Sequence, residues 1–202
     1  METLLCPGYE KILVLFHEDK RARIHLRKIA RKARMNENSA SRFLKQLEEQ
    51  RILTAEKDGN LKKYHLRPNP LTYAIFSYMD IKKLNSLPSI RKNAIHTFLS
   101  SLKDKPIMAI LFGSTARGTY AKDSDIDILA IVNKKIEIEG ARQETESQTT
   151  IRVNLIQISY HTFIEELRSR RDPVIQSAIA TGFPIFGHVE YYEVYYRETQ
   201  RP

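Results

Sequence analysis

Two aspartates and a Gly-Ser pair are the residues of this sequence best suited to chemistry. Residues 107–132 read IMAILFGSTARGTYAKDSDIDILAIV, with one apolar run before Gly113-Ser114 and another after Asp127. Asp125 and Asp127 are two positions apart, so on a strand their side chains project from the same face, about 7 Å apart. Carboxylates so placed repel each other unless a cation lies between them, and oxygen ligands suit Mg²⁺ or Mn²⁺. The sequence predicts that Asp125 and Asp127 hold such an ion.

The turn between the two apolar runs is suited to binding phosphate. Gly113 allows the backbone to approach a phosphate closely, and Ser114 adds a hydroxyl beside its own N–H. Arg117 lies four residues after Gly113 and could neutralise charge on a triphosphate, although a solvated arginine is the alternative. We expect Gly113, Ser114 and Arg117 to bind a nucleotide. Ser114 is expected to take part in catalysis together with Asp125 and Asp127.

These residues resemble the motif of the DNA polymerase β nucleotidyltransferase superfamily, most closely that of its minimal nucleotidyltransferases. The motif is Gly-Ser, ten residues, Asp, one residue, Asp, which Gly113-Ser114 and Asp125-Ile126-Asp127 match without a gap. The similarity extends over about residues 90–187 and includes the closing FPIFG. It implies a mixed sheet flanked by helices, with an NTP and Mg²⁺ as substrate or ligand. The reaction it implies is transfer of NMP from the NTP to a hydroxyl or similar acceptor, with release of pyrophosphate.

One position departs from the superfamily pattern. Active members carry a third carboxylate on a later strand, and the matching position in the predicted strand at residues 151–156 is Asn154. An amide oxygen can ligate a metal but cannot act as a general base. Either the acceptor supplies its own base, or Glu137 or Glu139 substitutes, or the domain binds nucleotide without transferring it. Loss of a general base lowers a rate by about 10²–10⁴-fold, so Asn154 does not by itself exclude catalysis.

The first third of the chain carries most of the positive charge. The formal net charge is +9, and residues 1–67 contribute +7 of it, with 16 Lys or Arg against 9 Asp or Glu. Residues 20–34 contain eight basic residues and no acidic one. Such a segment binds a polyanion if its side chains share one surface, and it is a solvated helix face if they do not.

The pattern of the first third resembles the winged helix-turn-helix of small bacterial and archaeal regulators, over about residues 9–67. Apolar spacing predicts helices at residues 9–19 and from Ile24, then a third helix with Asn36 as its N-cap. Alternating runs at residues 52–57 and 60–66, separated by Asp58-Gly59, predict a hairpin. The resemblance implies that the third helix enters the major groove of double-stranded DNA and that hairpin lysines reach phosphates. The residues concerned are Asn38, Ser39, Ser41, Arg42 and Lys45 on the helix, and Lys57, Lys62 and Lys63 on the hairpin. Docking of a protein is the alternative role.

Residues 68–105 are predicted to form a helical connector. Pro68 and Pro70 end the hairpin, and apolar residues predict helices at about residues 71–84 and 89–103. These helices either pair two subunits into a homodimer or pack against their own domain. Four tyrosines near the C-terminus, spaced like one helix face, indicate packing or a subunit interface.

The sequence predicts an α+β chain. It combines an N-terminal winged helix-turn-helix (1–67), the connector (68–105) and a C-terminal nucleotidyltransferase-fold mixed sheet flanked by helices (106–202). The longest apolar run has six residues, 107–112, and no signal peptide is recognisable, so we expect a cytoplasmic protein without a membrane partner. Cys6 is the single cysteine, which excludes a disulfide within the chain.

Three readings of the function remain. One is a DNA-binding nucleotidyltransferase that modifies a protein side chain, a small molecule or a nucleic-acid end. The second is a transcriptional regulator whose nucleotidyltransferase domain only senses nucleotide. The third, implied by the resemblance to minimal nucleotidyltransferases, is an antitoxin-like protein that modifies a toxin.

Overall fold

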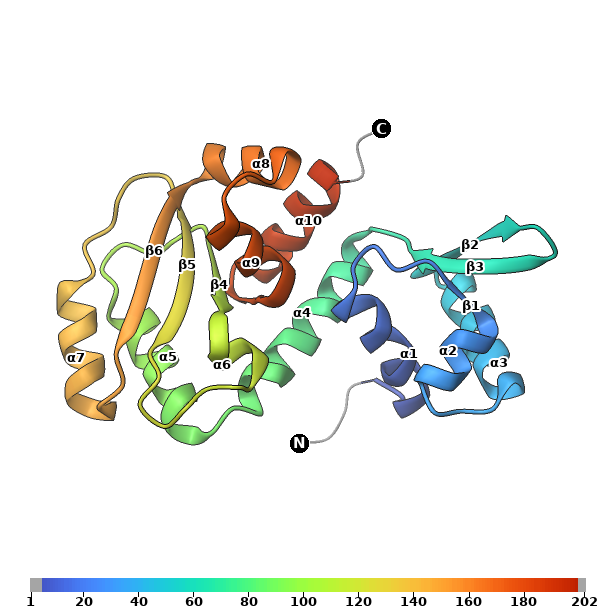
Figure 1. Ribbon diagram of the computed structural model, residues 1–202, viewed down its shortest axis with the longest axis horizontal. Coiled ribbons are helices and arrows are strands. Elements are labelled where there is room, and N and C mark those ends of the chain that lie inside the picture. Colours follow the sequence, from blue (N-terminus) through green and yellow to red (C-terminus); the bar gives the residue numbers. More distant parts are fainter. Residues whose placement is uncertain (1–4, 200–202) are drawn as a thin grey trace. The chain divides into compact units, whose positions relative to one another are not determined.

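The computed structural model describes residues 5–199, and the chain divides into two compact units, Met1–Thr72 and Tyr73–Pro202 (Figure 1). The division falls inside one helix, α4 (Pro70–Asn85). No helix in residues 5–199 is both long enough and apolar enough to span a bilayer.

The first unit consists of three helices and a small antiparallel sheet whose strand order is β1-β3-β2. Its elements are α1 (Pro7–Glu18), β1 (Ile24–His25), α2 (Leu26–Lys32), α3 (Glu37–Glu49), β2 (Leu53–Asp58) and β3 (Leu61–Leu66). Each helix buries one apolar stripe, with Phe16, Ile29 and Leu44 fully buried. Asn36 caps α3 by accepting a hydrogen bond from the backbone N–H of Ser39 at 2.8 Å. The three predicted helices, the cap and the hairpin are all present.

The hairpin turns one residue later than predicted. β2 continues through Asp58, which pairs with Leu61, so the two-residue loop is Gly59-Asn60. Gly59 has φ = +59°, and a type II′ loop requires such a positive φ at its first residue. The glycine therefore occupies the first loop position, and the aspartate is the last residue of the strand.

The second unit is built on a mixed four-stranded sheet in the order β6-β5-β4-β7. Its strands are β4 (Met108–Phe112), β5 (Ile126–Val132), β6 (Val153–Ser159) and β7 (Phe183–Phe186). β4 is antiparallel to β5 and β7, whereas β5 and β6 are parallel. Its helices after α4 are α5 (Ser89–Ser101), α6 (Gly113–Arg117), α7 (Glu139–Thr149), α8 (Tyr160–Ser169), α9 (Pro173–Thr181) and α10 (His188–Thr199). The mixed sheet flanked by helices agrees with the sequence-based prediction.

Helices cover both faces of this sheet, with α5 and α7 on one face and α8, α9 and α10 on the other (Figure 1). This accounts for the continuous apolar runs in the sequence: every residue of β4 is buried, as are all residues of β5 except Asp127. The sheet forms a rigid base for the side chains at its edge.

The helices of the predicted connector belong largely to the second unit. Ala94, Ile95 and Phe98 of α5 are fully buried in the core beside the sheet. Phe76 of α4 packs edge-on against Tyr192 of α10, whose hydroxyl donates to the buried Asp80 carboxylate at 2.6 Å. Both helices thus contribute buried side chains to the second unit, while Ile81 and Ile90 remain exposed.

The C-terminal segment forms separate helices. The chain turns between α8 and α9, where Arg170 has φ = +53° and Asp172 caps α9 through two backbone N–H groups. In α10 the four predicted interfacial or packing tyrosines are all buried: Tyr191, Tyr192, Tyr195 and Tyr196. They pack within the second unit.

Candidate functional site

Three strand ends bring the motif residues into one row. Phe112 at the end of β4 pairs with Asp127 of β5, and Asp127 pairs with Asn154 of β6. Paired residues on neighbouring strands point to the same face, so Asp127 and Asn154 lie side by side, with the turn that begins at Gly113 on the other side of Asp127. Asp125 is exposed and immediately precedes β5. The fold therefore gathers Gly113, Asp127 and Asn154 from three strands.

Gly113 is required at its position for two independent reasons. Its φ is +70°, which disfavours other residues, and a Cβ there would collide with the Asp127 carboxylate. The backbone of the turn therefore lies directly against that carboxylate. The turn continues as the short helix α6, which ends at Gly118 with φ = +71°. Ser114 is half-buried beside Gly113, whereas Arg117 is exposed at the last position of α6.

Asn154 is hydrogen-bonded to the carboxylate that it neighbours. Its Nδ2 donates to Oδ1 of Asp127 at 3.1 Å. A carboxylate at this position would repel Asp127 unless a cation lay between them, whereas the amide donates a hydrogen bond instead. The amide oxygen of Asn154 is a neutral group that could also ligate a metal.

The residues of the row suit a cation that arrives with a nucleotide. Within residues 5–199, no three His, Cys, Asp or Glu side chains are grouped to hold a metal. Asp125 and Asp127 offer two carboxylates, and Mg²⁺ typically takes one or two from the protein and fills its other positions with substrate phosphates and water. The chemistry of these two side chains therefore fits Mg²⁺ bound together with phosphates.

Glu137 lies away from Asn154 along β6. Ile136, beside Glu137, donates its N–H to the side chain of Gln157 at 2.9 Å. Gln157 is three residues beyond Asn154 on β6, which is about 10 Å along the strand. Glu139 is the first residue of α7, three positions before Arg142. The geometry thus argues against Glu137 replacing a base at Asn154.

Arg91 is a site residue that sequence reasoning missed. It lies on α5, is only 2% exposed, and its Nη1 donates to Oγ1 of Thr115 in α6 at 2.9 Å. Its Nη2 donates to the carbonyl oxygens of Ala121 and Ser124, each at 2.9 Å, and its guanidinium lies 4.0 Å from the ring centroid of Tyr120. Arg91 therefore fastens the loop that ends at Asp125. Its partners are 24 to 33 residues further along the chain, and no spacing rule connects them.

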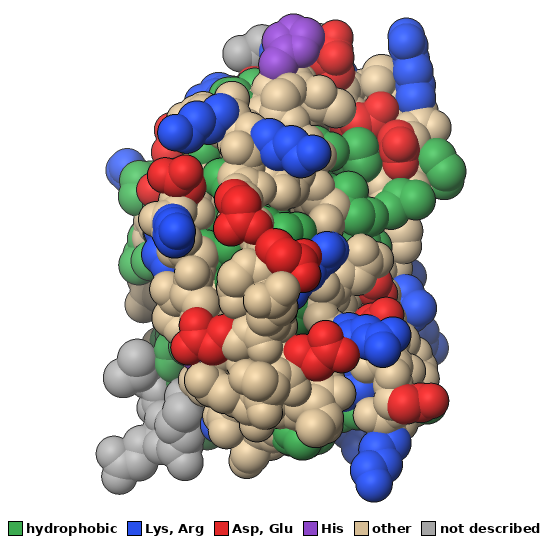
Figure 2. Space-filling model, turned by 90° about the vertical axis from the view of Figure 1, so that its left-hand side faces the viewer, with side chains coloured by type: hydrophobic (Ala, Val, Ile, Leu, Met, Phe, Trp, Pro, Cys, Tyr) green, Lys and Arg blue, Asp and Glu red, His purple; other side chains and the backbone are tan. Residues whose placement is uncertain are grey.

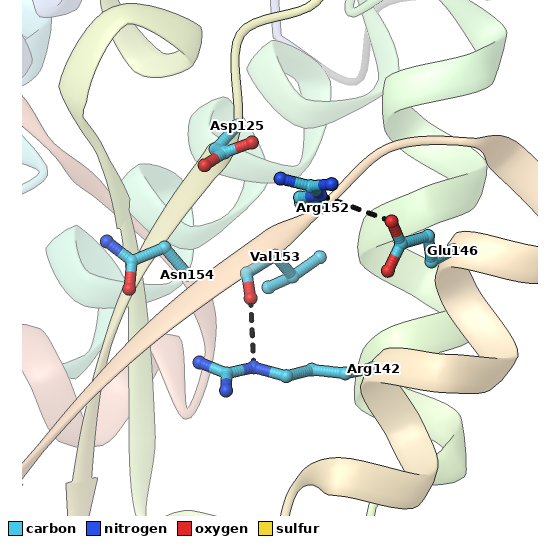
Figure 3. A pocket seen from close by; sticks show the side chains of 6 residues that line it. All are labelled: Asp125, Arg142, Glu146, Arg152, Val153 and Asn154. Carbon is cyan, nitrogen blue, oxygen red and sulfur yellow. Dashed lines mark hydrogen bonds and ion pairs between the residues drawn. The ribbon is translucent and has the colours of Figure 1, made fainter.

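A pocket of about 250 Å³ adjoins the row on its Asn154 side (Figure 3). It is lined by Asp125, Arg142, Glu146, Arg152, Val153 and Asn154. Arg142 and Glu146 come from α7, and Arg152 directly precedes β6. None of these three charged residues belongs to a motif, which is why the sequence did not indicate them.

In the first unit, the predicted DNA-contacting residues of α3 are mostly exposed. Asn38, Ser41, Arg42 and Lys45 are exposed at helical spacing, while Ser39 is half-buried. The backbone N–H of Ser39 is taken up by the Asn36 cap. The exposed residues share one face of α3, which is a prerequisite for contact with a groove.

The three hairpin lysines differ from one another. Lys57 and Lys62 are exposed and directly paired across β2 and β3, so two like charges face each other. Lys63 instead forms an ion pair with Asp58, Nζ to Oδ2 at 2.7 Å, and this bond lowers the pKa of Asp58 below its ordinary value. Lys63 is therefore partly neutralised within the hairpin.

Comparison with known proteins supports the assignment of the second unit. Residues 92–181 match the family model of the nucleotidyltransferase domain, from α5 to α9. No curated protein matches the chain in sequence.

Two solved structures are similar to parts of the chain. A chain from "Crystal structure of the toxin-antitoxin with AMP-PNP" is 25% identical over 53% of this chain and 82% of its own, with a TM-score of 0.38. A chain of ZitR from Lactococcus lactis in complex with DNA is 20% identical over 50% of this chain and 75% of its own, with a TM-score of 0.28. At these TM-scores neither likeness establishes a shared fold. The family model and the mixed sheet support a nucleotidyltransferase domain at residues 92–181.

Proposed function

We propose that the second unit binds an NTP with Mg²⁺ and transfers NMP to a hydroxyl or similar acceptor. The observation that carries this proposal is the contact of the Gly113 backbone with the Asp127 carboxylate. It supports the proposal because the turn that would bind phosphate lies beside the carboxylate that would hold the metal. Gly113 and Ser114 would hold the β and γ phosphates, Asp125 and Asp127 would hold Mg²⁺, and Arg117 would add positive charge.

The proposed transfer forms one bond to phosphorus and breaks another. The acceptor oxygen forms a bond to the α phosphorus, the bond from that phosphorus to the bridging oxygen breaks, and pyrophosphate leaves. The hydroxyl proton passes to water, because the Asn154 amide cannot accept it. Asp125 and Asp127 would hold Mg²⁺, which when bound would supply positive charge to the phosphates. The protein contributes position, since Gly113, Asp127 and Arg91 fix the turn and the loop relative to each other.

The activity is tested by incubating the protein with Mg²⁺ and each α-labelled NTP, and by following pyrophosphate release and label transfer to protein. Asp125→Asn and Asp127→Asn should abolish both signals, whereas Asp123→Asn, an exposed acid of the same loop, should not. Label on the protein itself would identify a protein acceptor. Signals that persist in Asp127→Asn would contradict the proposed site.

We also propose that the first unit, to about residue 67, is a winged helix-turn-helix that binds double-stranded DNA. Its order of elements supports this, with a short strand between the first two helices and a hairpin after the third. The facing Lys57 and Lys62 support it too, because a DNA phosphate would relieve a repulsion that the folded hairpin leaves in place. A twofold DNA site would favour a homodimer, which sedimentation of the full chain tests.

DNA binding and nucleotide transfer are tested separately. Duplex affinity should fall with rising salt, and Arg42→Ala and Lys45→Ala should weaken it, whereas Lys103→Ala of the second unit should not. If nucleotide binds without transfer and changes the DNA affinity, the chain is a nucleotide-sensing transcriptional regulator. Unchanged duplex binding by the Arg42 and Lys45 variants would exclude α3 as the reading helix.

A further inference from the structure

The pocket beside Asn154 lies on the opposite side of Asp127 from the phosphate-binding turn. Gly113 follows β4, which is one neighbour of β5, and Asn154 belongs to β6, which is the other neighbour and an edge strand. In phosphoryl transfer the attacking and leaving oxygens are roughly in line on opposite sides of the phosphorus. If pyrophosphate departs toward Gly113, the acceptor approaches from the side of this pocket.

Arg142 is the cation of the pocket that is held in place and still has donors to offer. It is half-buried, and its Nε donates to the backbone oxygen of Val153 at 3.2 Å (Figure 3). Within residues 5–199, its two terminal nitrogens have no hydrogen-bond acceptor. A guanidinium anchored through Nε presents these nitrogens as a planar fork that matches two oxygens of a phosphate.

The second arginine of the pocket is already paired. Arg152 Nε lies 3.2 Å from Oε1 of Glu146, and both side chains are largely exposed, at 75% and 52%. Exposed ion pairs of this kind contribute little and rearrange easily. In this structure Glu146 is paired with Arg152, whereas no ion pair of Arg142 is present among residues 5–199. The remaining acid of the pocket is Asp125, the proposed ligand of Mg²⁺.

Resting on the proposed function, we infer that this pocket binds a phosphate group of the acceptor through Arg142. A volume of about 250 Å³ suits one phosphate and the few carbon atoms beside it. Figure 2 looks toward the side of the second unit that carries α7 and shows acidic and basic side chains interspersed. A long polyanion would need a continuous basic surface, which this side does not offer. We therefore infer that the acceptor is a small phosphorylated molecule that carries its reactive hydroxyl near the phosphate.

The inference is tested on the full chain with inorganic phosphate as the probe, in buffer with Mg²⁺ and without nucleotide. The Nε–Hε resonance of Arg142 is followed by NMR during titration with phosphate, against chloride at the same ionic strength. Arg142→Gln should weaken phosphate binding by about tenfold or more, since a charge-assisted bidentate contact is lost. Arg142→Lys keeps the charge but loses the bidentate geometry, so its affinity for phosphate should lie between those of the original protein and Arg142→Gln. Arg171→Gln, an exposed arginine after α8, is the matched control.

Binding of each Mg²⁺-NTP is measured on the same variants and should be retained by Arg142→Gln. If that variant loses nucleotide and phosphate to the same extent, the pocket belongs to the nucleotide and the inference is overturned. It is also overturned if phosphate fails to shift the Arg142 resonance. If no NTP binds to any form while Arg142 still responds to phosphate, the anion site stands and the proposed transferase function fails.

Discussion

Replacing Arg91 by methionine should loosen the loop that carries Asp125 and thereby weaken nucleotide binding. The side chain is 2% exposed, and its hydrogen bonds reach Thr115 in α6 and the carbonyl oxygens of Ala121 and Ser124. Methionine keeps the length and the burial of the side chain but none of the three hydrogen bonds. Ser124 immediately precedes Asp125, so the change acts on the position of that carboxylate without touching it.

The size of the effect follows from these contacts. Hydrogen bonds to a charged group contribute about 1.5–3 kcal/mol each, but water can replace part of this at the carbonyls of the exposed loop. We expect the free energy of unfolding to fall by about 2–4 kcal/mol. Ordering a single loop residue again on binding costs about 1–2 kcal/mol, which corresponds to roughly a 5–30-fold increase in the Kd for Mg²⁺-NTP.

Calorimetry measures the Kd for Mg²⁺-NTP at a temperature where the original protein and Arg91→Met are both folded. Hydrogen exchange measures how well the loop at residues 118–125 is ordered. Lys92→Met removes a cation from the neighbouring position of α5 and should leave both measurements unchanged. The positioning role of Arg91 would be refuted if the loop exchanged faster in Arg91→Met while the Kd stayed within about twofold of the original, because each 1.4 kcal/mol corresponds to tenfold.

Three further predictions concern other parts of the chain. Gly113→Ala should abolish nucleotide binding, because the added Cβ would collide with the Asp127 carboxylate. Gly118 has a similar φ of +71° but open space around it, so Gly118→Ala should only lower the free energy of unfolding in urea by about 1–2 kcal/mol. Equal effects of the two substitutions on nucleotide binding would contradict the close approach of Gly113 to Asp127. Burial lowers the pKa of His188 below its ordinary 6.5, so the folded state favours the neutral ring, and its contribution to stability is present above about pH 6.5 and lost as the pH falls. His188→Gln should therefore lose less stability than the original between about pH 7 and pH 5, and an identical pH dependence would exclude this cause. Lys57→Ala should weaken duplex binding and reduce by about one the slope of log affinity against log salt concentration. The hairpin should be as stable as before or more stable by about 0.2–1 kcal/mol, because the repulsion from Lys62 is removed. A less stable hairpin would show that the facing lysines do not repel.

The motif and the sheet that carries it could be predicted because their signals are local. The spacing of Gly113, Asp125 and Asp127 and the apolar runs beside them predicted two strands on either side of a Gly-Ser turn, and β4 and β5 are observed there. Asn154 could be aligned with the row because it follows the start of another apolar strand, and the observed pairing with Asp127 agrees. Periodicity likewise predicted the three helices and the hairpin of the first unit.

The parts that could not be predicted depend on contacts between distant segments. The amphipathic pattern of α5 predicts that one face of the helix is buried, but it does not identify the packing partner. That partner is the sheet of the second unit. Arg91 looks like any helix arginine until the loop at residues 120–124 folds over it. Arg142 and Glu146 gain their place beside Asn154 only because α7 runs along β6, the edge strand of the sheet.

Mg²⁺-dependent binding of nucleotide by calorimetry tests the central claim most directly. The turn at Gly113-Ser114 and the carboxylates of Asp125 and Asp127 predict that the full chain binds an NTP with Mg²⁺ and much more weakly without it. Asp127→Asn should lose the dependence on Mg²⁺, whereas Asp123→Asn should keep it. Binding that is equally tight in Asp127→Asn, or tight without Mg²⁺, would contradict a metal–nucleotide site at these three strand ends.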